Sequence, residues 1–471
     1  MPRTKANIVL ILADDMGYGD FGVFNEGLTC TPAIDSVIAG GVCFTQHYSA
    51  SPVCAPARAG LLTGRYPHRS GVIDTYEVLG LDRMALDAVT IGDILSSQGY
   101  ATGLVGKWHC GAFDMRYHPT RRGFREFIGF SGGWSDYYQW VIEENGAERS
   151  GDGSYLTDRL ADAAVQFIGR HKSEPFFLHV AFNAPHFPIQ APEEEMAPFR
   201  DNQSLTTGVR TLYAMIRRMD RGIERILHEL SASGLEENTI VLITSDNGPD
   251  FGGKGDGALA RFNCNYRGSK TYVYEGGIRV PAVLRWPAGI ERRDQCDDLV
   301  MFYDWLPTLL AAAGVPVPGE LALDGMSILP VLQGRHGSRN ARKTFWQWNR
   351  FHPDVRTNAA MRDGEWKLVQ PAVEATMPSH DPTNVTSMDA YQKYHKHEVR
   401  NIRPEELPGP VAFEAEKPKL FNLANDPSEE RDLAAERPQQ VNAMLAELTK
   451  WFGAVRPGST PGPNLKSHNE A

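Results

Sequence analysis

Cys54 stands at the start of a segment whose residue types suit nucleophilic chemistry on an anion. The segment covers residues 51–65 and contains the spacing Cys54-x-Pro56-x-Arg58. Proline is favoured in the first helical turn, where its missing N–H costs no hydrogen bond, so we expect a helix to begin near Cys54. A helix N-terminus carries partial positive charge, and Arg58 follows one turn later. For a lone cysteine, a buried structural thiol would be the favoured interpretation.

Oxygen-bearing side chains follow two expected strands. Residues 8–12 and 239–244 are apolar runs typical of strands buried on both faces. In open α/β sheets, ligands bind at the carboxyl ends of such strands. Adjacent carboxylates repel, so a cation is needed if both are ionised, and oxygen-only ligation predicts calcium or magnesium rather than zinc. A polar loop or helix cap is the alternative for the first pair. The residues are Asp14 and Asp15 after the first run, and Asp246 and Asn247 after the second.

Two further strands are expected to deliver basic and titratable side chains. Residues 101–105 lead into Lys107 and His109, which point to the same side of an extended chain. Residues 175–182 lead to His186, which lies between two prolines and therefore outside any helix interior. A cation beside an imidazole suits anion binding and proton transfer. Surface-loop positions and ordinary hydrogen bonds are the alternatives for these side chains.

These segments, in this order, resemble the motifs of the type I sulfatases. The Cys-x-Pro-x-Arg spacing is followed by Leu-Thr-Gly-Arg, as in that family, and the resemblance extends from Asn7 to about Leu448. The arginine-rich and aromatic layout of residues 116–138 is similar to the arylsulfatase B-like (N-acetylgalactosamine-4-sulfatase-like) branch. The other matching motifs are Gly106-Lys107-Trp108-His109, Ala184-Pro185-His186-Phe187-Pro188, Arg267-Gly268-Ser269-Lys270 and Glu275-Gly276-Gly277.

The resemblance implies a fold and an activity. The fold would be an alkaline-phosphatase-like α/β sandwich, with a large mixed sheet flanked by helices and a smaller C-terminal α/β domain containing an antiparallel sheet. The activity would be hydrolysis of sulfate monoesters of carbohydrates or phenols. A formylglycine-generating enzyme would convert Cys54 to formylglycine, whose hydrate would attack sulfur. The implied calcium ligands are Asp14, Asp15, modified Cys54, Asp246 and Asn247.

The resemblance also assigns roles to the other charged side chains. Arg58 and Lys107 would hold and activate the hydrate at position 54. Lys270 and His186 would bind sulfate, and His186 would protonate the leaving alcohol. His109 would take a proton from the remaining hydroxyl. The implied catalytic set is Cys54, Arg58, Lys107, His109, His186 and Lys270.

Composition limits the other function classes. The chain has 471 residues, 42% of them hydrophobic and 23% charged, as in an ordinary globular protein. A net charge of −10 without a basic stripe disfavours a nucleic-acid partner. The sequence contains no run of about 18 apolar residues, so we expect no membrane span. The start lacks a signal-peptide pattern, and six cysteines have no paired spacing, so we expect a reducing, cytoplasmic location, or a periplasmic or secreted one if a leader was removed. The sequence leaves a homo-oligomer open.

The patterning changes after about residue 333. We expect a catalytic domain over residues 1–333 and a smaller domain over residues 334–471. Alternating strands are predicted at residues 344–349, 356–370 and 419–423, with a polar insertion at about residues 371–418 and a disordered tail after residue 457.

Two rival functions are compatible with parts of the pattern. Phosphonate monoester or phosphodiester hydrolases of the same superfamily use a similar cysteine motif. A sugar-binding module without catalysis is the other rival, and the complete set of charged residues argues against it. Several aromatic or basic side chains could contact a sulfated sugar or simply pack in the core: Trp134, Tyr137, Tyr138, Trp346, Trp348, Arg350 and His352.

Overall fold

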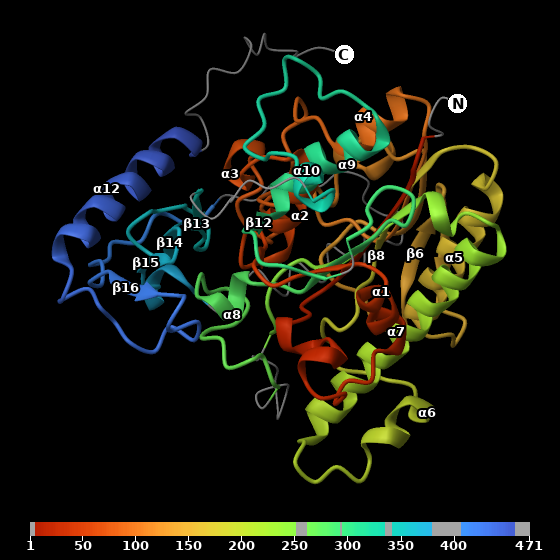
Figure 1. Ribbon diagram of the computed structural model, residues 1–471, viewed down its shortest axis with the longest axis horizontal. Coiled ribbons are helices and arrows are strands. Elements are labelled where there is room, and N and C mark those ends of the chain that lie inside the picture. Colours follow the sequence, from red (N-terminus) through yellow and green to blue (C-terminus); the bar gives the residue numbers. More distant parts are fainter. Residues whose placement is uncertain (1–4, 251–260, 293, 335–341, 379–406, 457–471) are drawn as a thin grey trace.

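The computed structural model describes residues 5–250, 261–292, 294–334, 342–378 and 407–456 (Figure 1). The expected insertion at residues 371–418 is described only at its two ends, which contain one short 3-10 helix, Glu374–Thr376. The tail predicted to be disordered lies outside the described residues. Among the described residues, no helix combines the length and apolar composition needed to cross a membrane.

A ten-stranded mixed sheet forms the centre of the larger part. Its strand order is β11-β2-β10-β9-β1-β8-β4-β5-β6-β7. The five strands from β9 to β5 are parallel, whereas β10, β2, β6 and β7 bring antiparallel pairings to the two sides. The bounds are β1 Asn7–Ala13, β2 Val42–Phe44, β4 Ala101–Lys107, β5 Glu126–Phe130, β6 Val141–Glu144, β7 Ala147–Ser150, β8 Phe176–Ala181, β9 Thr239–Ser245, β10 Ala282–Arg285 and β11 Gln295–Cys296.

Side chains from the central strands alternate between two hydrophobic cores, one on each face of the sheet. On β1, Ile8, Leu10 and Leu12 belong to one core, and Val9 and Ile11 belong to the other. This explains the unbroken apolar run in the sequence, because both faces are covered by helices. The helices are α1 Pro32–Ala39, α5 Leu156–His171, α6 Glu193–Met196 and α7 Thr207–Ala232 on one side, and α2 Cys54–Thr63, α3 Pro67–Ser70, α4 Ile91–Ser97, α9 Trp305–Ala313 and α10 Leu329–Leu332 on the other (Figure 1).

The smaller part is an antiparallel four-stranded sheet covered by a helix. Its order is β13-β14-β15-β16, and Gly364 at φ +60° turns the chain between β14 and β15. Trp451 stacks on Phe345 at 5.1 Å between ring centroids, which joins the final helix to the sheet. The predicted antiparallel sheet is therefore confirmed, whereas the boundary at residue 333 stays a prediction. The bounds are β13 Lys343–Gln347, β14 Ala359–Asp363, β15 Trp366–Gln370, β16 Lys419–Asn422 and α12 Pro438–Val455.

Short elements connect the two parts. The strand pair β3 and β12 forms a separate sheet, so the run at residues 42–48 is not one strand but two, with β2 in the large sheet and β3 outside it. Helix α8 follows the lysine motif and lies near the small sheet (Figure 1). The bounds are β3 His47–Tyr48, β12 Val300–Met301 and α8 Glu275–Ile278.

Strand order decides where the site can form. Strands β9, β1, β8 and β4 are parallel neighbours, so their carboxyl ends meet at one edge of the sheet. Each of the four predicted strand-end motifs follows one of them. The sheet therefore brings together residues that are 232 positions apart in the chain, since it pairs Ala13 with Ser245, and it also pairs Leu12 with Ala181.

Candidate active site

Helix α2 begins at Cys54, as the proline spacing predicts, and is buried along its whole length. Val53 is the N-cap and contributes no side-chain hydrogen bond, so the first turn presents free backbone N–H groups, while Gly64 at φ +66° ends the helix. The Cys54 side chain is only 3% exposed. Burial raises the pKa of the Cys54 thiol, and Lys107 and Lys270 act against that shift.

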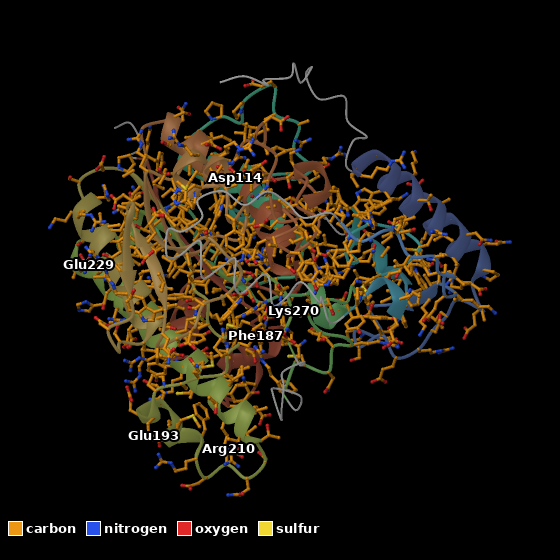
Figure 2. All side chains as sticks on the ribbon, turned by 180° about the vertical axis from the view of Figure 1, so that it is seen from behind. Asp114, Phe187, Glu193, Arg210, Glu229 and Lys270 are labelled. Carbon is orange, nitrogen blue, oxygen red and sulfur yellow. The ribbon has the colours of Figure 1, made fainter. Side chains whose placement is uncertain are left out.

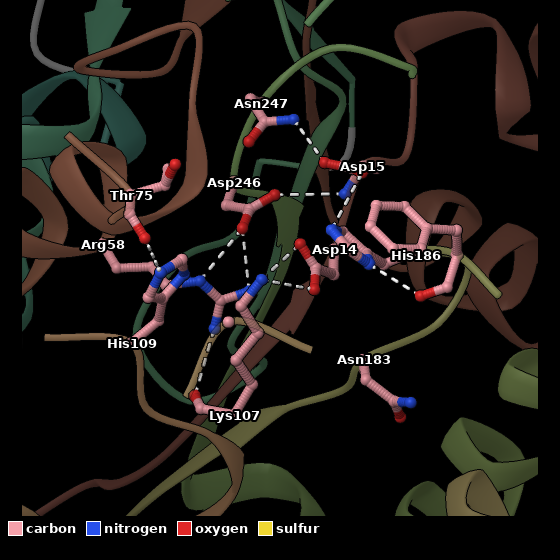
Figure 3. Close-up of polar contacts among 12 residues, drawn as sticks. Asp14, Asp15, Arg58, Thr75, Lys107, His109, Asn183, His186, Asp246 and Asn247 are labelled. Carbon is pink, nitrogen blue, oxygen red and sulfur yellow. Dashed lines mark hydrogen bonds and ion pairs between the residues drawn. The ribbon is translucent and has the colours of Figure 1, made fainter. Parts of the chain in front are cut away.

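The expected metal ligands from the ends of β1 and β9 converge, and Figure 3 shows Asp14, Asp15, Asp246 and Asn247 together. Ligand atoms of Asp14, Cys54 and Asp246 lie within 4.8 Å of one another, as do those of Asp14, Asp15 and His186. The backbone N–H of Asp15 donates to Asp246 Oδ1 at 3.1 Å, which ties the ends of β1 and β9 together. All three carboxylates are buried. This is the cluster of acidic groups that the strand ends predict.

Two oxygen atoms in this cluster lack hydrogen bonds. Among the described residues, neither Asp14 Oδ1 nor Asn247 Oδ1 has a hydrogen-bond partner, although both atoms are buried. The amide nitrogen of Asn247 is occupied, because it donates to Asp15 Oδ1 at 2.7 Å. The free acceptors are hard oxygen atoms, so the donor set fits a hard divalent cation.

Three cationic side chains pair with the three carboxylates. Lys107 Nζ lies 2.7 Å from Asp14 Oδ2, and Lys270 Nζ lies 2.7 Å from Asp15 Oδ2. Arg58 donates to Asp246 Oδ2 from Nε at 3.0 Å and from Nη2 at 2.8 Å. These predicted cations therefore reach the site from α2, β4 and the loop before α8, and Figure 3 shows the first two, Arg58 and Lys107.

Burial and charge act differently on the two neighbouring aspartates. Burial raises the pKa of Asp14, against the opposing effect of Lys107 and with a further rise from Asp246. Burial would also raise the pKa of Asp15, but Lys270, His186 and Lys107 together hold it below its ordinary value. Asp14 is thus the carboxylate that gains most from an added cation.

His186 lies close to Asp15. Its Nδ1 is 2.8 Å from the carbonyl oxygen of Phe187, which can only accept, so Nδ1 carries the proton and Nε2 faces Asp15 Oδ2 at 3.6 Å. Burial and Lys270 keep the pKa of His186 well below its ordinary value, and Asp15 opposes this. The Phe187 ring, 4.3 Å from the His186 ring between centroids, is exposed, and Figure 2 labels it together with Lys270.

His109 follows Lys107 at the end of β4, in a left-handed conformation with φ +52°. Its Nε2 lies 3.1 Å from the carbonyl oxygen of Thr75. Burial keeps the pKa of His109 well below its ordinary value, and Lys107 adds to the shift. The structure therefore brings all ten predicted site residues to one region. The expectation that the chain is extended from Lys107 to His109 is wrong, because β4 ends at Lys107 and His109 is left-handed.

Several supporting residues were not predicted from the sequence. Tyr137 was a possible sugar contact, but it is fully buried, and its hydroxyl donates to the carbonyl oxygens of Asn183 and His186 at 2.9 and 2.8 Å. It therefore supports the His186 loop. Trp346 is likewise buried, and its Nε1 donates to the Ser49 carbonyl oxygen. An apolar or aromatic residue type gives no signal for such backbone contacts.

The family model for sulfatases matches residues 6–315. The chain belongs to the sulfatase family. A second model, described as the C-terminal part of N-sulphoglucosamine sulphohydrolase, matches residues 268–404. The protein is thus a sulfuric ester hydrolase.

Individual relatives agree with this assignment. N-acetylgalactosamine-6-sulfatase of Homo sapiens is 34% identical over 70% of this sulfatase and 66% of that protein. Steryl-sulfatase of Rattus norvegicus is 28% identical over 95% of this chain and 88% of that protein. The crystal structure of Ps i-CgsB in complex with k-i-k-neocarrahexaose is 29% identical and covers 95% of this chain and 93% of its own, with a TM-score of 0.79.

These relatives confirm the alkaline-phosphatase-like architecture of the sulfatase fold, with its large mixed sheet and smaller antiparallel sheet. They do not single out the predicted N-acetylgalactosamine-4-sulfatase-like branch, because they include a steryl-sulfatase and an N-acetylgalactosamine-6-sulfatase.

Proposed function

We propose that this sulfatase hydrolyses sulfate monoesters of carbohydrates, with Cys54 converted to formylglycine and calcium as the bound cation. Two relatives support a saccharide substrate: one is named for N-acetylgalactosamine, and the other was crystallised with k-i-k-neocarrahexaose. A formylglycine-generating enzyme is then a required partner. Aryl sulfates remain a second substrate class.

The observation that carries this proposal is the balance of buried charge around Cys54. The carboxylates and cations there are equal in number, so one divalent cation would make the site net positive. A positive, water-poor site suits a sulfate monoester, which carries one negative charge, and stabilises charge that develops during transfer. The groups counted are Asp14, Asp15 and Asp246 against Arg58, Lys107 and Lys270.

Asp14, Asp15, Asp246 and Asn247 would hold the cation. When bound, calcium supplies a Lewis acid that polarises a sulfate oxygen. The carboxylates would then turn from the lysines to the ion. We expect the ammonium groups of Lys107 and Lys270, which now contact Asp14 and Asp15, to be released for the oxygen atoms of the ester.

Position 54 would supply the nucleophile. When formed, formylglycine supplies an aldehyde whose hydrate attacks sulfur. Arg58 is fixed by Asp246 one helical turn away and would orient that group. His186 has the free Nε2 needed to carry a proton to the leaving oxygen, and His109 would accept a proton on the opposite side of the reaction.

Mass spectrometry and paired assays test the proposal. Active protein should be lighter by about 18 Da in the peptide containing Cys54, the change from thiol to aldehyde. An unaltered mass in fully active enzyme would refute the formylglycine assignment. The enzyme should cleave the sulfate ester of a phenol faster than the phosphonate ester of the same phenol. Faster cleavage of the phosphonate ester would favour the rival hydrolase. A panel of sulfated oligosaccharides, aryl sulfates and a steryl sulfate then tests the substrate class, and preference for the last two would refute a carbohydrate substrate.

A further inference from the structure

The His109 ring is fixed by a loop that no predicted motif contains, residues 74–77. Nε2 of His109 lies 3.1 Å from the Thr75 carbonyl oxygen. A carbonyl oxygen only accepts, so Nε2 must carry the proton. Within the described part of the chain, His109 Nδ1 is buried and has no hydrogen-bond partner. The ring is thus oriented with an unused lone pair on Nδ1.

Glu77 comes from the same loop and reaches the same nitrogen. Its Oε1 lies 3.8 Å from His109 Nε2, and the side chain is 9% exposed. The backbone N–H of Gly133 donates to this oxygen. A Cβ atom at Gly133 would lie 2.7 Å from His109 Cε1 and 3.1 Å from Glu77 Oε1, so the backbone packs directly on the pair. Carboxylate, glycine and imidazole therefore form one packed unit.

Residues that follow β13 of the smaller sheet hydrogen-bond to this loop. After β13, Arg350 Nη1 donates to Asp74 Oδ1 at 2.7 Å and to Thr75 Oγ1 at 3.0 Å. The Arg350 guanidinium lies over Tyr76, 4.4 Å from the ring centroid. The backbone N–H of Phe351 donates to Asp74 Oδ2 at 3.3 Å. A guanidinium held by a carboxylate, a hydroxyl and a ring has little freedom, so the loop is a rigid support.

We propose that Glu77 and Arg350 are positioning residues, which hold His109 as the Nε2–H tautomer and leave Nδ1 as the proton acceptor of the reaction. This inference rests on the proposed function of His109. The proton would pass from a hydroxyl oxygen at position 54 to Nδ1, and the electron pair of that O–H bond would stay on the oxygen. The resulting imidazolium would keep its Nε2–H bond to Thr75, and the proton would return to water after product release.

The groups around the ring explain why a carboxylate is useful there. Lys107, Arg58 and His186 all disfavour an imidazolium at His109, and Glu77 is the acidic group that faces it. Burial raises the pKa of Glu77 to about 8, with Asp82 adding to the rise and the Gly133 N–H and Lys107 opposing it. A proton gained by His109 would favour ionised Glu77, so the pair can change charge together at little cost.

Imidazole ¹⁵N NMR tests the tautomer without activity, cation or formylglycine. Unmodified protein with Cys54 intact is used, and His109→Gln identifies the signal. The wild type should show a protonated Nε2 and an unprotonated Nδ1. Glu77→Ala and Arg350→Ala should each give a mixture of tautomers. A protonated Nδ1 in the wild type, or an unchanged tautomer in both variants, would overturn the inference.

Kinetics on the modified enzyme give the second measurement. Glu77→Ala should lower kcat by about 10²-fold with KM changed less than about twofold, as expected for loss of a proton-transfer geometry. Glu77→Gln keeps an acceptor for Gly133, so it should fold and keep the tautomer, but its acid limb in the kcat–pH profile should move to lower pH. A raised KM that accounts for most of the loss in Glu77→Ala, or a kcat–pH profile of Glu77→Gln identical to that of the wild type, would contradict the proposal.

A matched control comes from another histidine–glutamate pair. His118 Nε2 lies 3.0 Å from Glu143 Oε2, outside the site. Glu143→Gln should leave both the His109 signal and kcat unchanged, and a change equal to that of Glu77→Gln would overturn the specific role of Glu77. Failure of the proposed function is distinguishable, because the modified wild type would then not cleave sulfate esters, whatever its tautomer.

Discussion

Two buried ionic clusters can be compared in this sulfatase. The site cluster surrounds Cys54 and contains the three aspartates and three cations described above. The inter-sheet cluster joins the two parts of the molecule. There, Lys367 Nζ from β15 lies 2.8 Å from Glu275 Oε1 of α8 and 2.9 Å from Glu429 Oε1. Tyr48 donates to Glu275 Oε2 at 2.7 Å, and the Glu275 backbone N–H donates to Glu429 Oε2 at 2.6 Å. Both clusters are almost completely buried.

The clusters differ in how completely their oxygen atoms are paired. Three of the four carboxylate oxygens of the inter-sheet cluster accept a hydrogen bond, and the fourth, Glu429 Oε1, accepts none among the described residues but lies 2.9 Å from the Lys367 ammonium. In the site cluster, Asp14 Oδ1 has only Arg58 at 3.6 Å, and Asn247 Oδ1 has no hydrogen-bond partner among the described residues. Buried charge alone therefore does not indicate function, whereas buried acceptors left open indicate a missing ligand.

The largest effect should come from removing the centre of the site cluster. Cys54→Ala takes away the nucleophile, so kcat/KM should fall by at least about 10⁴-fold. Folding should persist, because alanine already occupies two neighbouring positions of α2, Ala55 and Ala57. Steady-state kinetics measure the loss of activity, and a thermal melt checks that the variant still folds. Activity within tenfold of the wild type would refute a nucleophile at this position.

Lys367→Met, in the inter-sheet cluster, should instead lower the stability of the fold. It leaves Glu275 and Glu429 buried without their shared cation, which should cost about 3–5 kcal/mol of unfolding free energy. Denaturant titration measures the loss. The control is Lys343→Met, since Lys343 forms a pair with Glu447 at 3.6 Å that is 44% and 42% exposed, and its loss should cost at most about 1 kcal/mol. Equal effects of the two variants would remove the distinction between clusters.

The sequence predicts the site cluster better than the inter-sheet cluster. Strands buried on both faces have a recognisable apolar pattern, and parallel order brings their carboxyl ends together, so Asp14 and Asp246 could be placed from sequence. Glu275 was recognised only as part of a motif. Its partner Lys367 lies 92 positions away, in a strand whose pattern shows alternation and not which neighbour it meets.

The support of His109 was also beyond sequence reasoning. Arg350 contacts Asp74 across 276 positions, and the loop at residues 74–77 has no helical or strand period. Helix α4 begins at Ile91, because the Thr90 side chain accepts from the Asp93 N–H and caps it. Short-range capping of this kind overrides the apolar pattern at the ends of elements.

Calcium binding should affect the stability of the fold through the site cluster only, and by less than the Lys367→Met substitution does. Calcium at about 100 times its dissociation constant should stabilise the folded enzyme by about 2.7 kcal/mol, because only the folded state holds the ligands together. Chelation should reverse this and abolish activity. Asp14→Asn should lose the response and Lys367→Met should keep it, both read from melts with and without calcium. Stabilisation by zinc but not by calcium would contradict the oxygen-ligand assignment.

The smallest expected effect is a pH dependence confined to the inter-sheet cluster. Burial raises the pKa of Glu429 to about 7, against the opposing effect of Lys367, from an ordinary value of 4.5. A carboxyl with a raised folded-state pKa contributes stability that is full below about pH 4.5 and is lost as pH rises through about 7. The wild type should therefore lose about 2 kcal/mol relative to Glu429→Gln between about pH 5 and pH 8.

Glutamine at position 429 keeps an oxygen acceptor for the Glu275 N–H, so the variant tests charge and not the loss of a hydrogen bond. Denaturant titrations of both proteins across the pH range give the difference directly. A constant difference would mean that Glu429 stays ionised throughout, and Lys367 would then hold two full negative charges. That outcome would place two ionised carboxylates on one lysine in a structural cluster, and incomplete charge compensation would no longer separate a functional cluster from a structural one.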